Sequence, residues 1–248
     1  IGALIGWRLS HALLEQSMFL ILRRHWFLHD AGRGLIVAGL WPLAQIYPQG
    51  YLFGHGQLMP ALSDFLSDWL ESPVDLGALL RHGLDLSIEQ FWLAETIIAA
   101  CGLTGAMLLL LVLLRPSAPR VRLFFGLLLL TLAFKSLASA LLFAPSNAFA
   151  WITPGAEGGL LFGSAMLFGL TFAPPVAQRR IAAAMLAIAL LIVNIIPPNP
   201  YFVATMQTWI QGKFLNFNGA AHFLSLFWPY LAIWFLLHHT HRKKRAGV

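Results

Sequence analysis

Charged residues are scarce in this sequence. Asp, Glu, Lys and Arg make up only 10% of its 248 residues, whereas a soluble domain carries about a quarter. Hydrophobic residues make up 58%, and the mean hydropathy is +0.73. They form near-continuous runs of about 20 residues, long enough to span ~30 Å of hydrocarbon, and lack the amphipathic pattern of a soluble core. The composition excludes an ordinary soluble domain and predicts an integral membrane protein.

Cysteine and the common catalytic motifs are also rare or missing. Cys101 is the only cysteine and lies in an apolar run, so an intramolecular disulfide is excluded. The sequence contains no GxSxG, no phosphate-binding glycine loop, no HExxH and no CxxC. Hydrolase, ATPase and thiol-redox functions therefore lack their usual support. We assign no catalytic residue, no metal site and no cofactor from the sequence.

Seven apolar stretches predict an all-α fold, a polytopic bundle of transmembrane helices. They cover residues of about 1–22, 34–53, 91–114, 123–144, 158–173, 181–196 and 219–237. Just before the third stretch, Ser87 is followed three residues later by Gln90, a spacing typical of a capping box at a helix N-terminus.

The basic residues divide the connections into two sets. Twelve of the 16 Lys and Arg residues lie in the connections 23–33, 115–122 and 174–180 and in the tail 238–248. The alternate connections hold only Arg81 and Lys213, together with seven of the ten acidic residues. Basic residues near helix ends stay in the cytoplasm, so we predict a cytoplasmic C-terminus and an outer position for Ile1. This topology explains the net charge of +6 without a nucleic-acid partner.

Two segments on the predicted outer side each predict an amphipathic helix. In residues 58–71, leucine, phenylalanine and Trp69 recur at helical spacing, while serine and aspartate take the opposite face. In residues 199–219, Trp209 lies on the apolar face of a short helix that follows a proline-rich break. We predict that Trp69 and Trp209 contact a lipid or another amphiphile.

Ionisable residues inside the predicted spans form a second candidate site. Arg8, His11 and Glu15 share one stripe of the first span, and Lys135 lies near the middle of the fourth. Such residues cost roughly 2.5 to 3.5 kcal/mol each on insertion, so they normally face a protein interior, form pairs or line a water path. When depth is counted at ~1.5 Å per residue from the outer ends of the two spans, Lys135 lies close enough to the level of Glu15 for its side chain to pair with that carboxylate. The stripe either binds a lipid headgroup or proton-coupled substrate, or locks two helices structurally.

Two further residues near the predicted outer boundary are candidates for ligand contact. Glu95 lies near the outer mouth of the third span, where it either joins a polar pocket or is hydrated at the interface. His222 follows Asn216 and Asn218, whose amides could orient its ring, although an isolated interfacial histidine fits the same pattern.

Two stretches resemble the VanZ-like family of membrane proteins. WPLAQIYPQGYLFGHGQLMPALSDFLSDWL at 41–70 and PPNPYFVATMQTWIQGKFLNFNGAAHFLSLFWPY at 197–230 are similar to the long C-terminal extension of VanZ-like proteins from proteobacteria. IGALIG at 1–6 is similar to the last helix of their core domain. The resemblance implies that 1–22 ends a core domain and that 23–248 is a C-terminal membrane extension. We expect the missing upstream helices to be partners of this chain, in line with a first residue other than Met.

Three functions remain open. The leading hypothesis is a protein of the bacterial cytoplasmic membrane that binds or shields a lipid or a teicoplanin-type lipoglycopeptide at the outer leaflet. The resemblance suggests this, because the family takes its name from low-level teicoplanin resistance. The first alternative is a transporter or flippase that uses the polar stripe. The second is an enzyme acting on a lipid-linked cell-wall precursor, which requires carboxylates or histidines clustered at one depth. Membrane lipids are the expected partners in each case.

Overall fold

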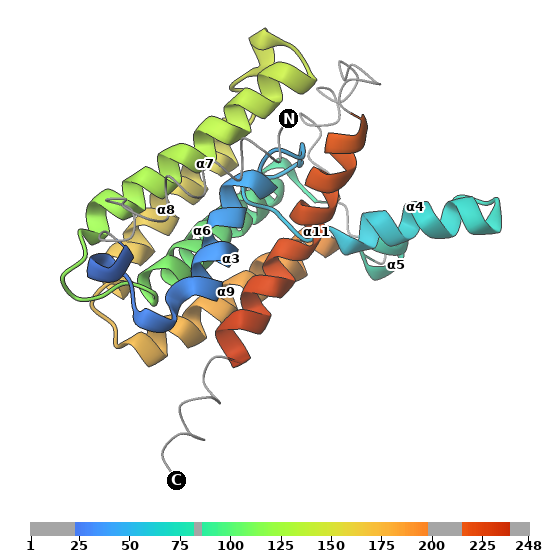
Figure 1. The fold of residues 1–248 in the computed structure, drawn as a ribbon. Helices are drawn as coiled ribbons and strands as arrows, with labels where there is room; N and C mark the ends of the chain where they lie inside the picture. The colour runs from blue at the N-terminus through green and yellow to red at the C-terminus, as the bar shows by residue number, and fades with distance from the viewer. Residues whose placement is uncertain (1–22, 82–85, 198–214, 239–248) are drawn as a thin grey trace.

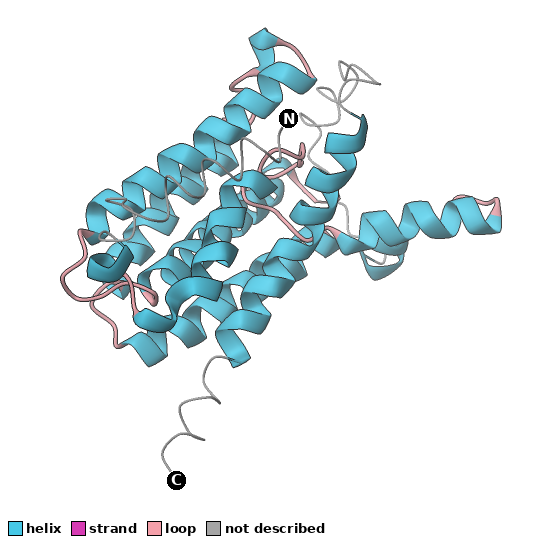
Figure 2. Cartoon of the chain, viewed as in Figure 1, coloured by secondary structure: helices cyan, strands magenta, loops and turns pink. Residues whose placement is uncertain are grey.

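The computed structural model describes residues 23–81, 86–197 and 215–238 (Figure 1). This part of the chain is all-helical, as the composition predicts (Figure 2). Within it the structure contains no β-strand, and the one extended pairing is an isolated bridge between Phe27 and Leu114.

The longer helices form one bundle. The described helices are α3 (Gly32–Ala44), α4 (Leu58–Leu70), α5 (Leu76–Arg81), α6 (Ile88–Leu111), α7 (Arg120–Leu142), α8 (Pro154–Leu170), α9 (Pro175–Ile195) and α11 (Leu215–His238). Four of them, α6, α7, α9 and α11, are long and apolar enough to cross a membrane. α8 is shorter, with 17 residues. These lengths are compatible with a multi-pass membrane protein.

Helix α6 is the centre of the bundle, and α8 and α9 pack against it. Gly155, Gly159 and Gly163 of α8 recur every four residues and bring its backbone close to α6. A Cβ atom at Gly159 would lie 2.3 Å from the Cβ of Ala99. The absence of side chains on this face of α8 therefore sets the distance between the two helices.

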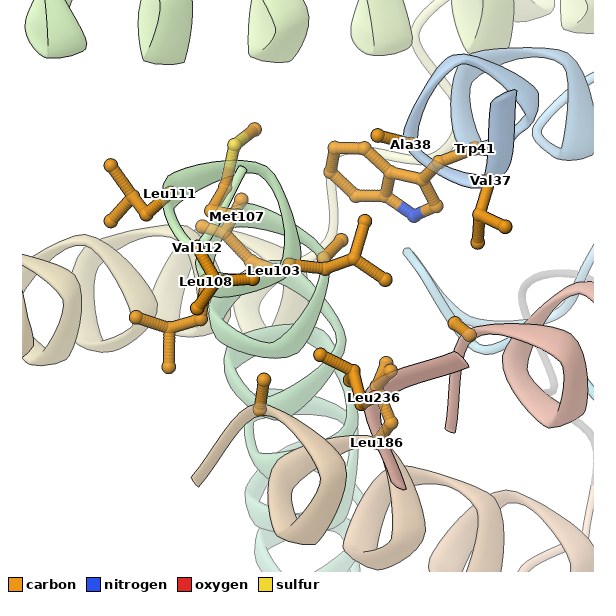
Figure 3. Close-up of a cluster of buried hydrophobic side chains, with 14 of the residues drawn as sticks. Val37, Ala38, Trp41, Leu103, Met107, Leu108, Leu111, Val112, Leu186 and Leu236 are labelled. Carbon is orange, nitrogen blue, oxygen red and sulfur yellow. The ribbon is translucent and has the colours of Figure 1, made fainter. Parts of the chain in front are cut away.

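The other side of α6 packs against α3, α9 and α11. Figure 3 shows Trp41 of α3 beside Leu103 and Met107 of α6, with Leu186 of α9 and Leu236 of α11 pointing into the same core. These side chains are among the most buried in the described part of the chain. The core thus joins the central helix to helices from both ends of the sequence.

Local sequence rules explain several helix starts. The predicted capping box at the start of α6 is confirmed: the N–H of Gln90 donates to Ser87 Oγ at 3.3 Å, and the N–H of Ser87 donates to Gln90 Oε1 at 2.9 Å. At α8, Thr153 Oγ1 accepts the N–H of Ala156 at 3.1 Å, and Pro154 is the first helical residue. Both starts follow from side chains within one turn of the helix.

The predicted span 34–53 is corrected by the structure. Helix α3 ends at Ala44 after 13 residues, and the chain continues to α4 without a helix. Pro48 has no N–H to donate, and three glycines follow it before α4 begins. The helix in this apolar stretch is therefore only about 20 Å long, at ~1.5 Å per residue, and is shorter than the predicted span.

Helix α4 occupies the predicted amphipathic segment and extends away from the bundle (Figure 1). Helix α5 packs beside it. On α4 the aromatic side chains of Phe65 and Trp69 are exposed, whereas Ser63 is buried and donates to the carbonyl oxygen of Met59 at 2.8 Å. The second predicted amphipathic helix, with Trp209, lies outside the described residues, as does the first predicted span, 1–22.

Opposite the base of α4, one end of the bundle carries the basic connections. It holds the segment 23–31, the α6–α7 and α8–α9 connections and the last turn of α11 (Figure 1). Hydrogen bonds join the first two: the N–H of Leu28 donates to Leu113 O at 2.9 Å, and the N–H of Arg115 donates to Trp26 O at 2.8 Å. Connections far apart in the sequence thus form a single structured end.

Candidate functional site

Residues 45–57, here called the buried loop, cross the interior of the protein between α3 and α4. Residues 51–56 are all buried, although none of them is helical. Buried backbone outside a helix needs hydrogen-bond partners from elsewhere in the protein, above all in a membrane protein. The buried loop therefore depends on the helices around it.

Helices α9 and α11 supply those partners. The N–H of Gly56 donates to the carbonyl oxygen of Ser225 at 3.1 Å. The carbonyl oxygen of Gly56 accepts from Asn194 Nδ2 at 2.9 Å and from the Tyr230 hydroxyl at 3.3 Å. Asn194 Oδ1 also accepts the N–H of Met59 at 2.8 Å. Side chains from two helices thus replace the hydrogen bonds that a continuous helix would have made.

The backbone of the buried loop adopts unusual conformations at two buried positions. Phe53 has φ of 58° and Gly56 has φ of 83°. The left-handed region is costly for a residue such as phenylalanine and persists only where the surroundings determine it. Here the ring of Phe53 packs against Trp41, with a centroid distance of 5.0 Å, and its backbone lies against Gly102 of α6. The loop is therefore held in a defined shape.

A cluster of polar side chains lies inside this loop. Gln45 Nε2 donates to His55 Nε2, which leaves His55 Nδ1–H to donate to Ser225 Oγ at 3.4 Å. Gln49 Nε2 donates to the same hydroxyl oxygen. One accepting and one donating nitrogen correspond to the neutral form of the imidazole.

Lys135, predicted from the sequence as an intramembrane cation, joins this cluster. Its side chain is 4% exposed, and its Nζ donates to the carbonyl oxygen of Gln49 at 3.4 Å. Within residues 23–81, 86–197 and 215–238 no ion pair connects it to a carboxylate. The expected partner Glu15 and the other members of the stripe, Arg8 and His11, lie outside the described residues.

The structure places the other predicted site residues apart from one another. Glu95 is 2% exposed and accepts a hydrogen bond of 2.6 Å from Thr153 Oγ1, so it lies in the α6–α8 contact and not at a hydrated interface. Trp69 is 73% exposed and lies near the end of α4, the helix that extends away from the bundle in Figure 1. Trp209 is outside the described residues. Of the predicted site residues that the structure describes, Lys135 and His222 lie near the buried loop.

His222 stacks on a residue of the buried loop. Its ring and that of Tyr47 are 4.3 Å apart between centroids and inclined by 17°. The Tyr47 phenol therefore lies directly against the half-buried imidazole of His222.

Two pockets open between the buried loop, the first turns of α4 and the helices behind them. The larger, of about 280 Å³, lies toward α9, and Tyr51, Asp75 and Asn194 are in its lining. The smaller, of about 100 Å³, lies toward α11 and is lined partly by Tyr47, Gln49 and His222. Both are bordered by Gln57, Pro60 and Asp64. The base of α4 thus separates two polar pockets.

The polar cluster contains acceptor atoms that the described residues do not satisfy. In this part of the chain, the side-chain oxygens Gln45 Oε1 and Gln49 Oε1 are buried without a hydrogen-bond partner. Leaving a buried polar atom unpaired costs about 1–3 kcal/mol, so such atoms usually meet a water or a ligand. This cluster was not among the sites predicted from the sequence, because hydropathy averaged over the stretch is apolar. The only trace of it in the sequence is that Gln45, Gln49 and His55 are polar residues within that apolar stretch.

Metal ligation finds no support in the described ranges, where no group of three or more His, Cys, Asp or Glu residues is close enough to hold an ion.

In comparisons with known proteins, the chain matches no family model, no curated protein and no solved structure.

Proposed function

We propose that this chain is the C-terminal membrane extension of a VanZ-like protein and binds an amphiphile at the outer leaflet of the bacterial cytoplasmic membrane. The amphiphile is a lipid or a teicoplanin-type lipoglycopeptide. One observation carries the proposal: two polar pockets lie at the base of α4, whose exposed side presents Phe65 and Trp69. An amphiphile needs this combination, a polar site for its head beside an apolar surface for its tail.

The positions of the resembling stretches support this assignment. Residues 41–70 contain the buried loop and α4, and the described end of 197–230 forms the first two thirds of α11. The two stretches pack together: Tyr47 stacks on His222, and Trp41 lies 6.2 Å from Trp228 between ring centroids. The residues that carry the resemblance therefore surround the smaller pocket.

The proposed topology has seven crossings, with the basic end of the bundle in the cytoplasm. Helix α3 and the buried loop together would make the second crossing, since α3 begins beside the basic connections and α4 begins at the opposite end (Figure 1). The hydrogen-bonded arrangement of the segment 23–31 with the α6–α7 connection supports a common side for both. Helix α4, the predicted helix with Trp209, both pockets and Ile1 then belong to the outer side.

A double substitution on α4 tests the proposal. Trp69→Ala with Phe65→Ala should weaken teicoplanin binding to the purified full-length chain about tenfold, because truncating a contact aromatic typically costs more than 1 kcal/mol. Vancomycin, which lacks the acyl tail, should bind much more weakly than teicoplanin to either protein. Binding is measured by titration in detergent, with size-exclusion chromatography to verify folding.

Phe172→Ala provides the matched control, because Phe172 is equally exposed, at 78%, but lies in the α8–α9 connection at the basic end. It should leave teicoplanin binding unchanged. Equal binding of teicoplanin by the parent and the α4 variant would contradict an amphiphile site at α4.

Lys135 favours transport as a second candidate function. An ammonium group enclosed in a membrane protein usually marks a substrate or proton path, and this one hydrogen-bonds a loop that borders both pockets. If the chain moves lipids, Lys135→Met should slow the translocation of a fluorescent lipid in proteoliposomes at least about tenfold, equivalent to 1.4 kcal/mol in the barrier. Folded yield should not fall, since an apolar side chain of similar length replaces a buried charge at little cost.

Arg122→Met is the control for the loss of a basic side chain from α7, because Arg122 is exposed near the start of that helix. Transport that persists in Lys135→Met would remove this candidate while leaving the binding proposal intact.

A further inference from the structure

The smaller pocket offers a set of groups that all favour one kind of ligand. Gln49 Oε1 is a hydrogen-bond acceptor, Asp64 carries a negative charge, and the stacked rings of Tyr47 and His222 present aromatic surface. Among the described residues that line this pocket there is no lysine or arginine, and Lys135, which donates to the backbone carbonyl oxygen of Gln49, is not part of the lining. The pocket therefore suits a positively charged hydrogen-bond donor and disfavours an anion.

The side-chain oxygen of Gln49 is the feature that most restricts the chemistry of the ligand. Its side chain is 93% buried, since only 7% remains exposed, and its Nε2 already donates to Ser225 Oγ. The same hydroxyl oxygen lies 3.4 Å from His55 Nδ1. Gln49 Oε1 is thereby left without a partner in the described part of the chain. A ligand that pairs with Gln49 must bring an N–H or O–H group.

Charge and aromatic surface restrict that ligand further. Asp64 borders the pocket from α4, and opposite charges within a few ångströms attract even at a partly solvated site. A cation against the face of Tyr47 gains further stabilisation from the ring's electron density. A neutral hydroxyl group would pair with Gln49 Oε1 but would gain little from the charge of Asp64 or the ring of Tyr47. An ammonium group interacts favourably with all three.

The volume of the pocket limits the size of the bound group. About 100 Å³ is available, whereas a water molecule occupies roughly 30 Å³ in the liquid. An aminoethyl group fits this space. The polar end of the ligand that enters the pocket is therefore small, with the remainder of the molecule outside.

From these features we propose that the smaller pocket, lined by Tyr47, Gln49, Asp64 and His222, binds the primary ammonium group of a small aminoalkyl moiety. This inference rests on the proposed function and specifies the headgroup chemistry of the amphiphile. The ammonium belongs either to a lipid of the phosphatidylethanolamine type or to a soluble amine. A quaternary ammonium has the same charge but no N–H, so it leaves Gln49 Oε1 unpaired.

Lipid titration monitored by native mass spectrometry tests the assignment. The purified full-length chain is titrated with short-chain phosphatidylethanolamine and, in parallel, with phosphatidylcholine of the same chain length. We expect phosphatidylethanolamine to bind about tenfold more tightly, as one well-formed charge-assisted interaction allows. Free ethanolamine is the competitor: displacement of the lipid shows that the ammonium alone is recognised, and failure to displace it shows that the acyl chains also contribute.

Asp64→Asn is the diagnostic variant, because Asp64 is exposed and the amide keeps its shape. It should reduce the preference for phosphatidylethanolamine to less than about threefold, since the charge attraction is lost. Asp68→Asn, one turn further along α4 and outside both pocket linings, should retain the full preference. Gln49→Leu should likewise reduce the preference, with unchanged size-exclusion behaviour as the check on folding.

The outcomes separate this inference from the function on which it rests. Equal binding of the two lipids, with binding still sensitive to Trp69→Ala, would overturn the ammonium assignment and leave amphiphile binding standing. A preference that survives Asp64→Asn would also overturn it. Binding of neither lipid and of no teicoplanin would overturn both proposals.

Discussion

Alanine at position 56 is expected to lower the free energy of unfolding by about 2–5 kcal/mol. Gly56 has φ of 83°, and a Cβ there would lie 2.3 Å from Leu190 Cδ2 and 2.8 Å from the ring of Pro229. The left-handed conformation costs an alanine roughly 1–2 kcal/mol, and overpacking of a tight site adds about 1–3 kcal/mol. The proline ring cannot rotate away, so the clash must move the loop or α11.

Unfolding of the purified chain in mixed micelles, followed by circular dichroism against increasing SDS, measures this effect. Gly169→Ala is the matched control, because a Cβ at Gly169 meets no atom within 4 Å. Its stability should equal that of the parent or exceed it slightly, since alanine favours helix. If Gly56→Ala were as stable as Gly169→Ala, the buried loop could not have the conformation described here. The two pockets would then have a different shape, because Gln57 and Pro60, which line both of them, lie within four residues of Gly56.

Truncation of Trp228 to alanine should have an effect of about 3–5 kcal/mol, the range for buried tryptophan in a packed core. Trp228 of α11 is 1% exposed, and its indole N–H donates to the carbonyl oxygen of Val37 at 2.8 Å. Its ring also lies against Trp41 and, at 5.7 Å between centroids, against His55. One side chain therefore joins α11, α3 and the buried loop.

Two further variants separate the contributions of Trp228. Trp228→Phe retains an aromatic ring but loses the hydrogen bond, so we expect a smaller loss of about 1–2 kcal/mol. Trp234→Ala removes a half-exposed tryptophan from the same helix and should change stability by less than about 1 kcal/mol. Thermal unfolding in detergent ranks the three variants. Equal losses for Trp228→Ala and Trp234→Ala would show that the α3–α11 contact does not stabilise the bundle.

The candidate site was only partly predictable. Lys135 was recognisable as a cation in an apolar stretch, but its contact with Gln49 connects segments 86 residues apart in the sequence. Glu95 was expected either in a polar pocket or at the hydrated interface, and its burial follows from the glycines of α8, which allow that helix to approach. The pairing of Tyr47 with His222 has no local signal, because stacking depends on how α11 packs against the buried loop.

By itself the sequence determined the helical, membrane-type character of this chain and the starts of helices such as α6. Run length, hydropathy and capping are properties of neighbouring residues, so they can be evaluated without a fold. Only the tertiary structure decided where α3 ends and what the residues after it do. A buried non-helical segment is stable only if distant groups satisfy its backbone. Here Asn194, Ser225 and Tyr230 supply them, and in doing so they create the pockets.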